Sequence, residues 1–163
     1  MSYPFCLPEN YKIISATPQG CDNDNGGVTF DSISLRLAHK VWIVLHAQQV
    51  VGHASIVNPL VGLTVAAANV AITFNARWWL NVDISLTDTL VEQIAATTMA
   101  FDVAQTDQLM VIEIDPEDVL AQLGTYDCLG GTITATGQDN YVSALYIAAV
   151  RYEQATPPSM IVA

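Results

Sequence analysis

The chain has 163 residues, of which 52% are hydrophobic and 13% charged, and its 16 acidic and 5 basic side chains give a net charge of −11. This composition excludes a disordered chain, because disorder combines high charge with few apolar residues, and it predicts one domain with a buried core. No nucleic-acid partner is expected, since the scattered basic residues form no patch that could neutralise phosphates. Those residues are Lys12, Arg36, Lys40, Arg77 and Arg151.

Residues 1–27 differ from the rest of the chain and predict an extended N-terminal arm. They contain three prolines and the aromatic residues Tyr3, Phe5 and Tyr11, and they close on an Asn-Gly-Gly run. Proline blocks regular strand pairing and helix interiors, and the closing run favours a tight turn. Such an arm either lies on its own domain or reaches a neighbouring subunit. Residues 28–163 then form a single β-sandwich domain.

The cysteines and the apolar stretches bear on compartment. Cys6, Cys21 and Cys128 are odd in number and lack CxxC spacing, which favours free thiols in a reducing compartment, although Cys6 and Cys21 could pair. The first residues include neither a basic region nor a long apolar run, so no signal peptide is expected. Between Val41 and Ala76 only histidines can carry charge, but interspersed polar residues favour buried strands over a membrane helix. We therefore expect a soluble protein without a membrane partner.

Apolar residues in the first half predict short strands. Val28 and Phe30 alternate in one phase and Ile33, Leu35 and Leu37 in the other, so a bulge or bend is expected near residues 31–32. The continuous apolar run 41–45 is typical of a strand that is covered on both faces.

The clearest alternation runs from Trp78 to Thr87 and predicts a strand. Because neighbours on a strand point to opposite faces, one of Trp78 and Trp79 can fill the core while the other meets a second surface, unless both are aromatic residues at the core edge. Residues 110–114 predict another strand, and the segments 132–136 and 141–152 the last two. Gly130 and Gly131 are interpreted as a turn. Segments 88–104 and 141–152 also fit a helical spacing, so the sequence leaves strand and helix open there.

One helix is marked by local signals. Asp115 is placed to cap it, Pro116 occupies the first helical position, Glu117 and Asp118 follow in the first turn, and Gly124 ends it. The sequence therefore predicts an all-β fold, an antiparallel jelly roll or β-sandwich, with one short helix at about 116–123.

No constellation of residues points to metal binding. His39, His46 and His53 recur every seven residues, but on strands an odd spacing sends neighbours to opposite faces. Asp22 and Asp24 imitate the start of a calcium loop. That loop would need a glutamate where Ile33 stands, so an Asx-type turn is expected instead. No metal and no cofactor are predicted.

No constellation points to catalysis either. Glu113 and Asp115 could act as a carboxylate pair in acid–base chemistry, but a solvated strand residue and a helix cap explain them better. Nucleophile-plus-histidine signatures and phosphate-binding glycine loops are missing from the sequence. We expect no catalytic residue and no enzyme.

Three stretches together resemble a known class of proteins: residues 79–88, residues 109–116, and residues 146–152 with Pro157 and Pro158 behind them. Their layout resembles small β-rich virion proteins of tailed bacteriophages, especially capsid decoration (cement) proteins with jelly-roll folds. The resemblance implies a non-catalytic homotrimer, made in the host cytoplasm, that sits on the capsid exterior and stabilises the head by clamping neighbouring major capsid subunits. The arm would be a tether. Candidate interface residues, for the capsid or a neighbouring subunit, are Tyr3, Phe5, Tyr11, Trp78, Trp79, Arg151 and Tyr152.

Two alternatives remain open at this point. The protein could be another virion component, in the tail or in receptor binding. It could instead be a small cupin-like metal-dependent enzyme that uses His39, His46 or His53, although the paired HxH of that family is missing.

Overall fold

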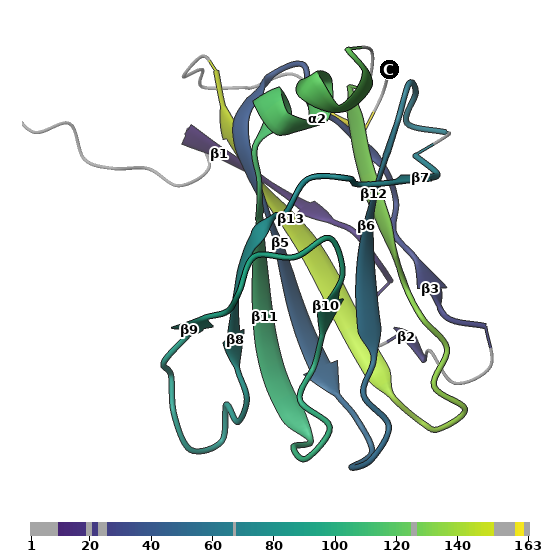
Figure 1. Cartoon of the computed structure of the whole chain (residues 1–163), viewed down its shortest axis with the longest axis vertical. Coiled ribbons are helices and arrows are strands. Elements are labelled where there is room, and N and C mark those ends of the chain that lie inside the picture. Colours follow the sequence, from purple (N-terminus) through teal and green to yellow (C-terminus); the bar gives the residue numbers. More distant parts are fainter. Residues whose placement is uncertain are drawn as a thin grey trace, which may run out of the picture.

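Two antiparallel sheets pack face to face in the computed structural model of this chain (Figure 1). The structure describes residues 10–18, 21–22, 26–66, 68–124, 127–151 and 159–161. The candidate residues Tyr3, Phe5 and Tyr152, together with Cys6 and Asp24, lie outside this part of the chain. No helix in the described ranges is long and apolar enough to cross a membrane.

The first sheet, sheet A, has the strand order β1-β13-β5-β11-β8-β9, with β2 also paired to β13. Its longest ladder joins β13 to β5 in the middle of the sheet. The strands are β1 (Tyr11–Ser15), β2 (Cys21–Asp22), β5 (Ala38–Gln48), β8 (Arg77–Asn81), β9 (Val91–Glu92), β11 (Asp107–Ile114) and β13 (Tyr141–Val150).

The second sheet, sheet B, has the order β10-β6-β12-β3, with β4 also paired to β12 and β7 to β6. Its strands are β3 (Val28–Thr29), β4 (Ile33–Ser34), β6 (Ile56–Gly62), β7 (Val70–Ala71), β10 (Met99–Ala100) and β12 (Cys128–Ile133).

The main ladders are nested along the chain. β5 pairs with β13, β6 with β12 and β8 with β11, so early strands meet late ones in reverse order. The connections from β5 to β6, from β11 to β12 and from β12 to β13 each cross from one sheet to the other. A long hairpin wrapped over two sheets in this way is a jelly roll, so the predicted fold class is confirmed.

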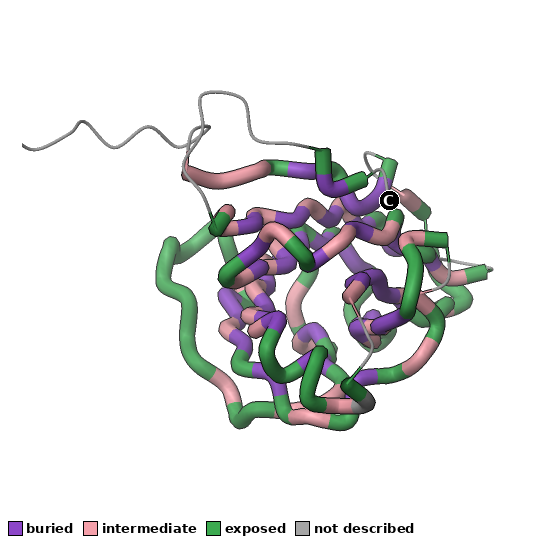
Figure 2. The backbone as a smooth tube through the Cα atoms, turned by 90° about the horizontal axis from the view of Figure 1, so that it is seen from above, coloured by how far each residue is buried: buried purple, intermediate pink, exposed green. Residues whose placement is uncertain are grey.

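Period-two alternation explains why these segments form the core. Along β5, Val41, Ile43, Leu45 and Ala47 are fully buried, while the residues between them are half-buried or exposed. Seen from above, buried positions line the space between the layers (Figure 2). The same alternation holds on β11 and β13, as expected for strands with one face in a sandwich core.

The predicted helix forms where the local signals place it. Helix α2 (Pro116–Leu123) begins after Asp115, whose side chain accepts a hydrogen bond from the Glu117 N–H at 3.0 Å. It ends at Gly124, which has a left-handed backbone (φ 72°) and donates its N–H to Leu120 O. Asp115 is thus a cap, as expected, and does not form a carboxylate pair with Glu113.

The structure resolves the segments that the sequence left open. Residues 141–150 are the strand β13, and residues 88–104 contain only the short strands β9 and β10. The bend near residues 31–32 is confirmed, because β3 and β4 pair with β12 on either side of it. Within the predicted arm, residues 11–15 form β1 at the edge of sheet A, paired with β13 over five positions.

Three expectations about strands were wrong. Gly130 and Gly131 lie inside β12, not in a turn, because Phe30 packs so closely that a Cβ on Gly131 would stand 2.6 Å from its ring. The strand that starts at Trp78 ends at Asn81, because the side chains of Asn81 and Asp83 accept backbone N–H groups two residues ahead and form turns. The run 41–45 is covered on one face only.

Buried amides tie together the loops at the end of the sandwich away from α2. Gln108 is fully buried; its Oε1 accepts the Asp102 N–H at 2.8 Å, and its Nε2 donates to Asp102 O at 2.7 Å and Gln105 O at 3.0 Å. Asn140 is also fully buried and joins Val50 N to His53 O. Their hydrogen bonds satisfy backbone groups that do not pair with a neighbouring strand, at the points where the chain passes from one sheet to the other.

Candidate functional site: the outer face of sheet A

Two rows of mostly apolar side chains cross the side of sheet A that faces away from sheet B. One row runs Ile13, Ile147, Trp42, Glu113 and Arg77, and the next runs Ser15, Leu145, Val44, Val111, Trp79 and Glu92, each joined by the strand register. Among the described residues, no strand or helix forms a layer over it (Figures 1 and 2). We call these two rows, with Tyr11, Ala149 and Lys40 above them, the outer face.

Glu113 is the centre of a charged cluster on this face. Its carboxylate accepts hydrogen bonds from Lys40 Nζ and Trp42 Nε1, both at 3.0 Å, and Arg77 approaches it to 3.5 Å. Arg77 also donates through Nε and an Nη atom to Glu92, at 3.0 and 2.9 Å. Two cations and two carboxylates therefore cancel on the outer face, and the rest of the chain carries the whole net charge of −11.

The environment of Glu113 favours its ionised form. Partial burial, which leaves 15% of the side chain exposed, would by itself raise its pKa. The hydrogen bonds from Lys40 and Trp42, with the charges of Lys40 and Arg77, outweigh that effect, so the pKa of Glu113 is lowered. This carboxylate is fixed as an anion among cations, which suits a positioning role better than proton transfer.

Aromatic side chains flank the cluster. The guanidinium of Arg77 lies 4.9 Å from the centre of the Trp79 ring, and Tyr11 lies 6.1 Å from Trp42, centre to centre. Both are ordinary distances for cation–π and aromatic pairs. These contacts hold the indole rings in place on the face.

A groove opens at the β1 side of the outer face, around the end of β1 at Ser15. It encloses about 420 Å³, and of its lining residues only His46 can carry a charge. The lining residues are Ile13, Ser15, Thr17, Val44, His46, Leu109, Ser143, Ala144 and Leu145. Such a hollow accepts aliphatic side chains better than a polar ligand.

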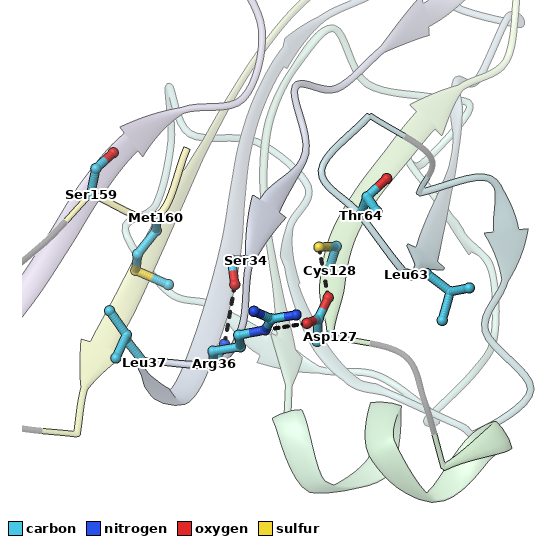
Figure 3. Close-up of a pocket in the computed structure, with 9 residues that line it drawn as sticks. All are labelled: Ser34, Arg36, Leu37, Leu63, Thr64, Asp127, Cys128, Ser159 and Met160. Carbon is cyan, nitrogen blue, oxygen red and sulfur yellow. Dashed lines mark hydrogen bonds and ion pairs between the residues drawn. The ribbon is translucent and has the colours of Figure 1, made fainter. Parts of the chain in front are cut away.

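A second cavity, of about 400 Å³, lies at the end of the sandwich near α2 (Figure 3). Arg36 and Asp127 form an ion pair in it, and the Cys128 thiol donates to the Asp127 carboxylate at 3.0 Å. Burial, with the hydrogen bond to Asp127 and its negative charge, raises the pKa of Cys128 to about 12. A thiol held protonated in this way is a poor nucleophile and a poor metal ligand.

The histidines and acidic residues tested above do not assemble into a metal site in the described chain. No three His, Cys, Asp or Glu side chains there could hold an ion together. His39, His46 and His53 are all exposed, and His39 and His46 stand seven residues apart on β5, about 23 Å. Cys21 and Cys128 are free thiols, and Asp22 lies exposed in β2.

The described candidate interface residues fall in different places. Trp78 and Trp79 point to opposite faces as predicted: Trp78 is buried in the core, where its Nε1 donates to Ile94 O at 2.9 Å, and Trp79 lies on the outer face. Tyr11 also lies on the outer face, four strands away from Trp79. Arg151 lies elsewhere, and its Nε donates to Ala38 O at 3.0 Å.

Sequence reasoning missed the centre of the outer face. Lys40, Trp42, Val44 and Glu113 were not singled out as interface residues, although residues 41–45 are apolar on both strand faces. That double-sided run was the available signal. A strand that is apolar on both faces is expected to be buried on both faces. No described segment of the chain packs over the outer face.

No protein-family model and no curated protein matches the chain. A chain from the structure of Triatoma virus has 10% sequence identity and a TM-score of 0.38, over 100% of this chain and 73% of that one. A chain from a structure described as "CBM4 structure and function" has 11% identity and a TM-score of 0.33, over 88% of this chain and 85% of that one.

Proposed function

We propose that this chain is a non-catalytic structural protein of a virus particle, which buries the outer face of sheet A against other protein subunits. The observation that carries the proposal is the outer face itself. Apolar side chains from β1, β13, β5, β11 and β8 surround an electrically balanced cluster of charges on it, in a chain whose remaining surface is strongly acidic. Contiguous apolar faces of this kind are typical of surfaces that bind protein.

The specific role that we propose is that of a capsid decoration protein on the exterior of a tailed-phage head, as the sequence resemblance implies. Its partners would be copies of itself, in a homotrimer, and neighbouring major capsid subunits. The acidic remainder of the surface supports an exterior position, because it repels nucleic acid and other particles while the balanced face binds. The cupin-like alternative finds no donor set among the described residues.

Purified particles test the proposal. Mass spectrometry of gradient-purified particles from a virus that encodes the chain should detect it in stoichiometric amounts with the major capsid protein. Antibody labelling of intact particles in the electron microscope should decorate the head. Label confined to the tail would refute the decoration role in favour of a tail component, and absence from purified particles would refute a virion role altogether.

A further inference from the structure

The loop that follows β8 carries aliphatic side chains into solvent. In segment 82–94, Leu86 is 84% exposed and Ile94 92% exposed, and four further aliphatic residues are more than a third exposed. The segment lies at the β8–β9 edge of sheet A, to the side of the sandwich (Figure 1). The four further residues are Val82, Ile84, Leu90 and Val91.

Hydrogen bonds within this loop and to the neighbouring strands β8 and β11 hold it in shape. Asn81 Nδ2 donates to Thr87 O at 2.7 Å, Asp83 accepts the Ser85 N–H at 3.0 Å, and Ile84 N donates to Asp107 O at 3.1 Å. A loop that is already ordered loses little conformational entropy on binding. Its exposed side chains are therefore well suited to a protein contact, which would remove them from water.

The groove on the outer face has the complementary character. Ile13, Val44, Leu109 and Leu145 supply its apolar walls, and it has no acidic lining residue. The side chains of Leu86 and Ile94 are almost completely exposed, so the groove of the same chain does not hold them. One chain thus carries an apolar projection and an apolar hollow, and neither fills the other within the described part of the molecule.

Charge favours the groove and the outer face as the place where a second copy docks, because the loop that approaches them carries the carboxylates Asp83 and Asp88. Two copies with a net charge of −11 repel each other wherever their acidic surfaces meet. The groove and the outer face beside it are the balanced region of the molecule, where a second copy can approach at the lowest electrostatic cost. Added salt screens the remaining repulsion and should strengthen such a contact.

We propose that one copy of this chain binds the next by inserting Leu86 and Ile94 into the groove between Ile13, Val44, Leu109 and Leu145. This contact rests on the proposed assembly function and specifies its self-association. Because it joins two different surfaces, an open assembly of bound copies always ends in one free loop and one free groove, so the contact propagates until a ring closes.

Analytical ultracentrifugation of the full chain tests the contact. At about 100 µM, well above a micromolar Kd, the wild type should sediment as a closed oligomer whose mass is a multiple of 17.6 kDa. The fraction of chains in that oligomer should rise at higher salt. A loop variant, Leu86→Ser with Ile94→Ser, and a groove variant, Val44→Ser with Leu109→Ser, should each weaken self-association at least about 100-fold. Leu63→Ser, an equally simple change at an exposed leucine outside both surfaces, should leave the mass unchanged.

A mixture of the loop variant and the groove variant gives the decisive measurement. The loop variant keeps an intact groove and the groove variant an intact loop, so the mixture should form one contact and stop at a heterodimer. Monomers in that mixture, a wild-type monomer at every salt concentration, or a loop variant with wild-type mass would each overturn the contact. A monomer that is nevertheless found in purified particles would overturn only this inference. A ring-forming protein that is absent from particles would overturn only the proposed function.

Discussion

Replacement of Gln108 by methionine tests whether the buried amides hold the loop end of the sandwich together. Methionine has nearly the same length and fits an apolar core, so the change removes hydrogen bonds without leaving a large cavity. Gln108 makes three such bonds, one from the Asp102 N–H and two to the carbonyl groups of Asp102 and Gln105. In the variant, the Asp102 N–H loses the acceptor that Gln108 supplies.

The expected cost follows from these bonds. A lost hydrogen bond costs about 1 kcal/mol net, and a buried donor left without a partner costs about 1–3 kcal/mol. Gln49 Nε2 also donates to both carbonyl oxygens, so part of the acceptor loss is compensated. We therefore expect Gln108→Met to lower the free energy of unfolding by about 2–4 kcal/mol.

Urea unfolding followed by tryptophan fluorescence measures this change. The midpoint should fall while the slope m stays constant, because the variant changes stability and not the surface exposed on unfolding. Gln48→Met is the matched control: Gln48 is exposed on β5, and its replacement should change stability by less than about 0.5 kcal/mol. If the two variants unfold at the same urea concentration, the buried amide network does not stabilise the loops.

Three other changes test separate parts of the structure. Trp78→Ala should cost about 3–5 kcal/mol of unfolding free energy, because Trp78 is a core residue, and Trp79→Ala about 1 kcal/mol or less; equal costs in urea unfolding would contradict their opposite orientations. The pKa of Glu113 is lowered in the folded chain, so its ionisation stabilises the fold above the ordinary glutamate pKa, and this stability is lost as the pH falls through the folded-state pKa. Glu113→Gln should therefore cost about 1 kcal/mol at pH 7 and make stability depend less on pH in acid. An unchanged acid profile would refute this. With its pKa at about 12, the Cys128 thiol should resist a thiol-specific reagent at pH 8 until the chain unfolds, in a variant with Cys6 and Cys21 replaced by serine; rapid labelling of the folded chain would contradict its burial.

Signals that act over a few residues were enough to predict several elements. Asp115, Pro116 and Gly124 fixed both ends of α2, because helix capping is decided by neighbouring backbone groups. The opposite directions of Trp78 and Trp79 followed from the geometry of any strand.

Features made by distant segments could not be predicted in the same way. Gly131 is needed inside β12 because Phe30, about a hundred residues earlier, packs on its backbone. The groove is lined by side chains of β1, β5, β11 and β13, which only the register between these distant segments brings together. Glu113 was interpreted as a solvated strand residue, yet its partners Lys40 and Arg77 come from the strands on either side.

The nested order of the ladders has a consequence for synthesis and folding. β13, the last strand, lies between β1 and β5, two of the earliest segments to leave the ribosome. Until residues 141–150 emerge, β1 has no neighbour in sheet A and the β5 edge stays open. Pairing between such distant segments is slow, because the loop must close before any bond forms. We therefore expect the β1–β13 side of sheet A to be completed only after translation of β13, so nascent chains cannot assemble prematurely through a groove that does not yet exist.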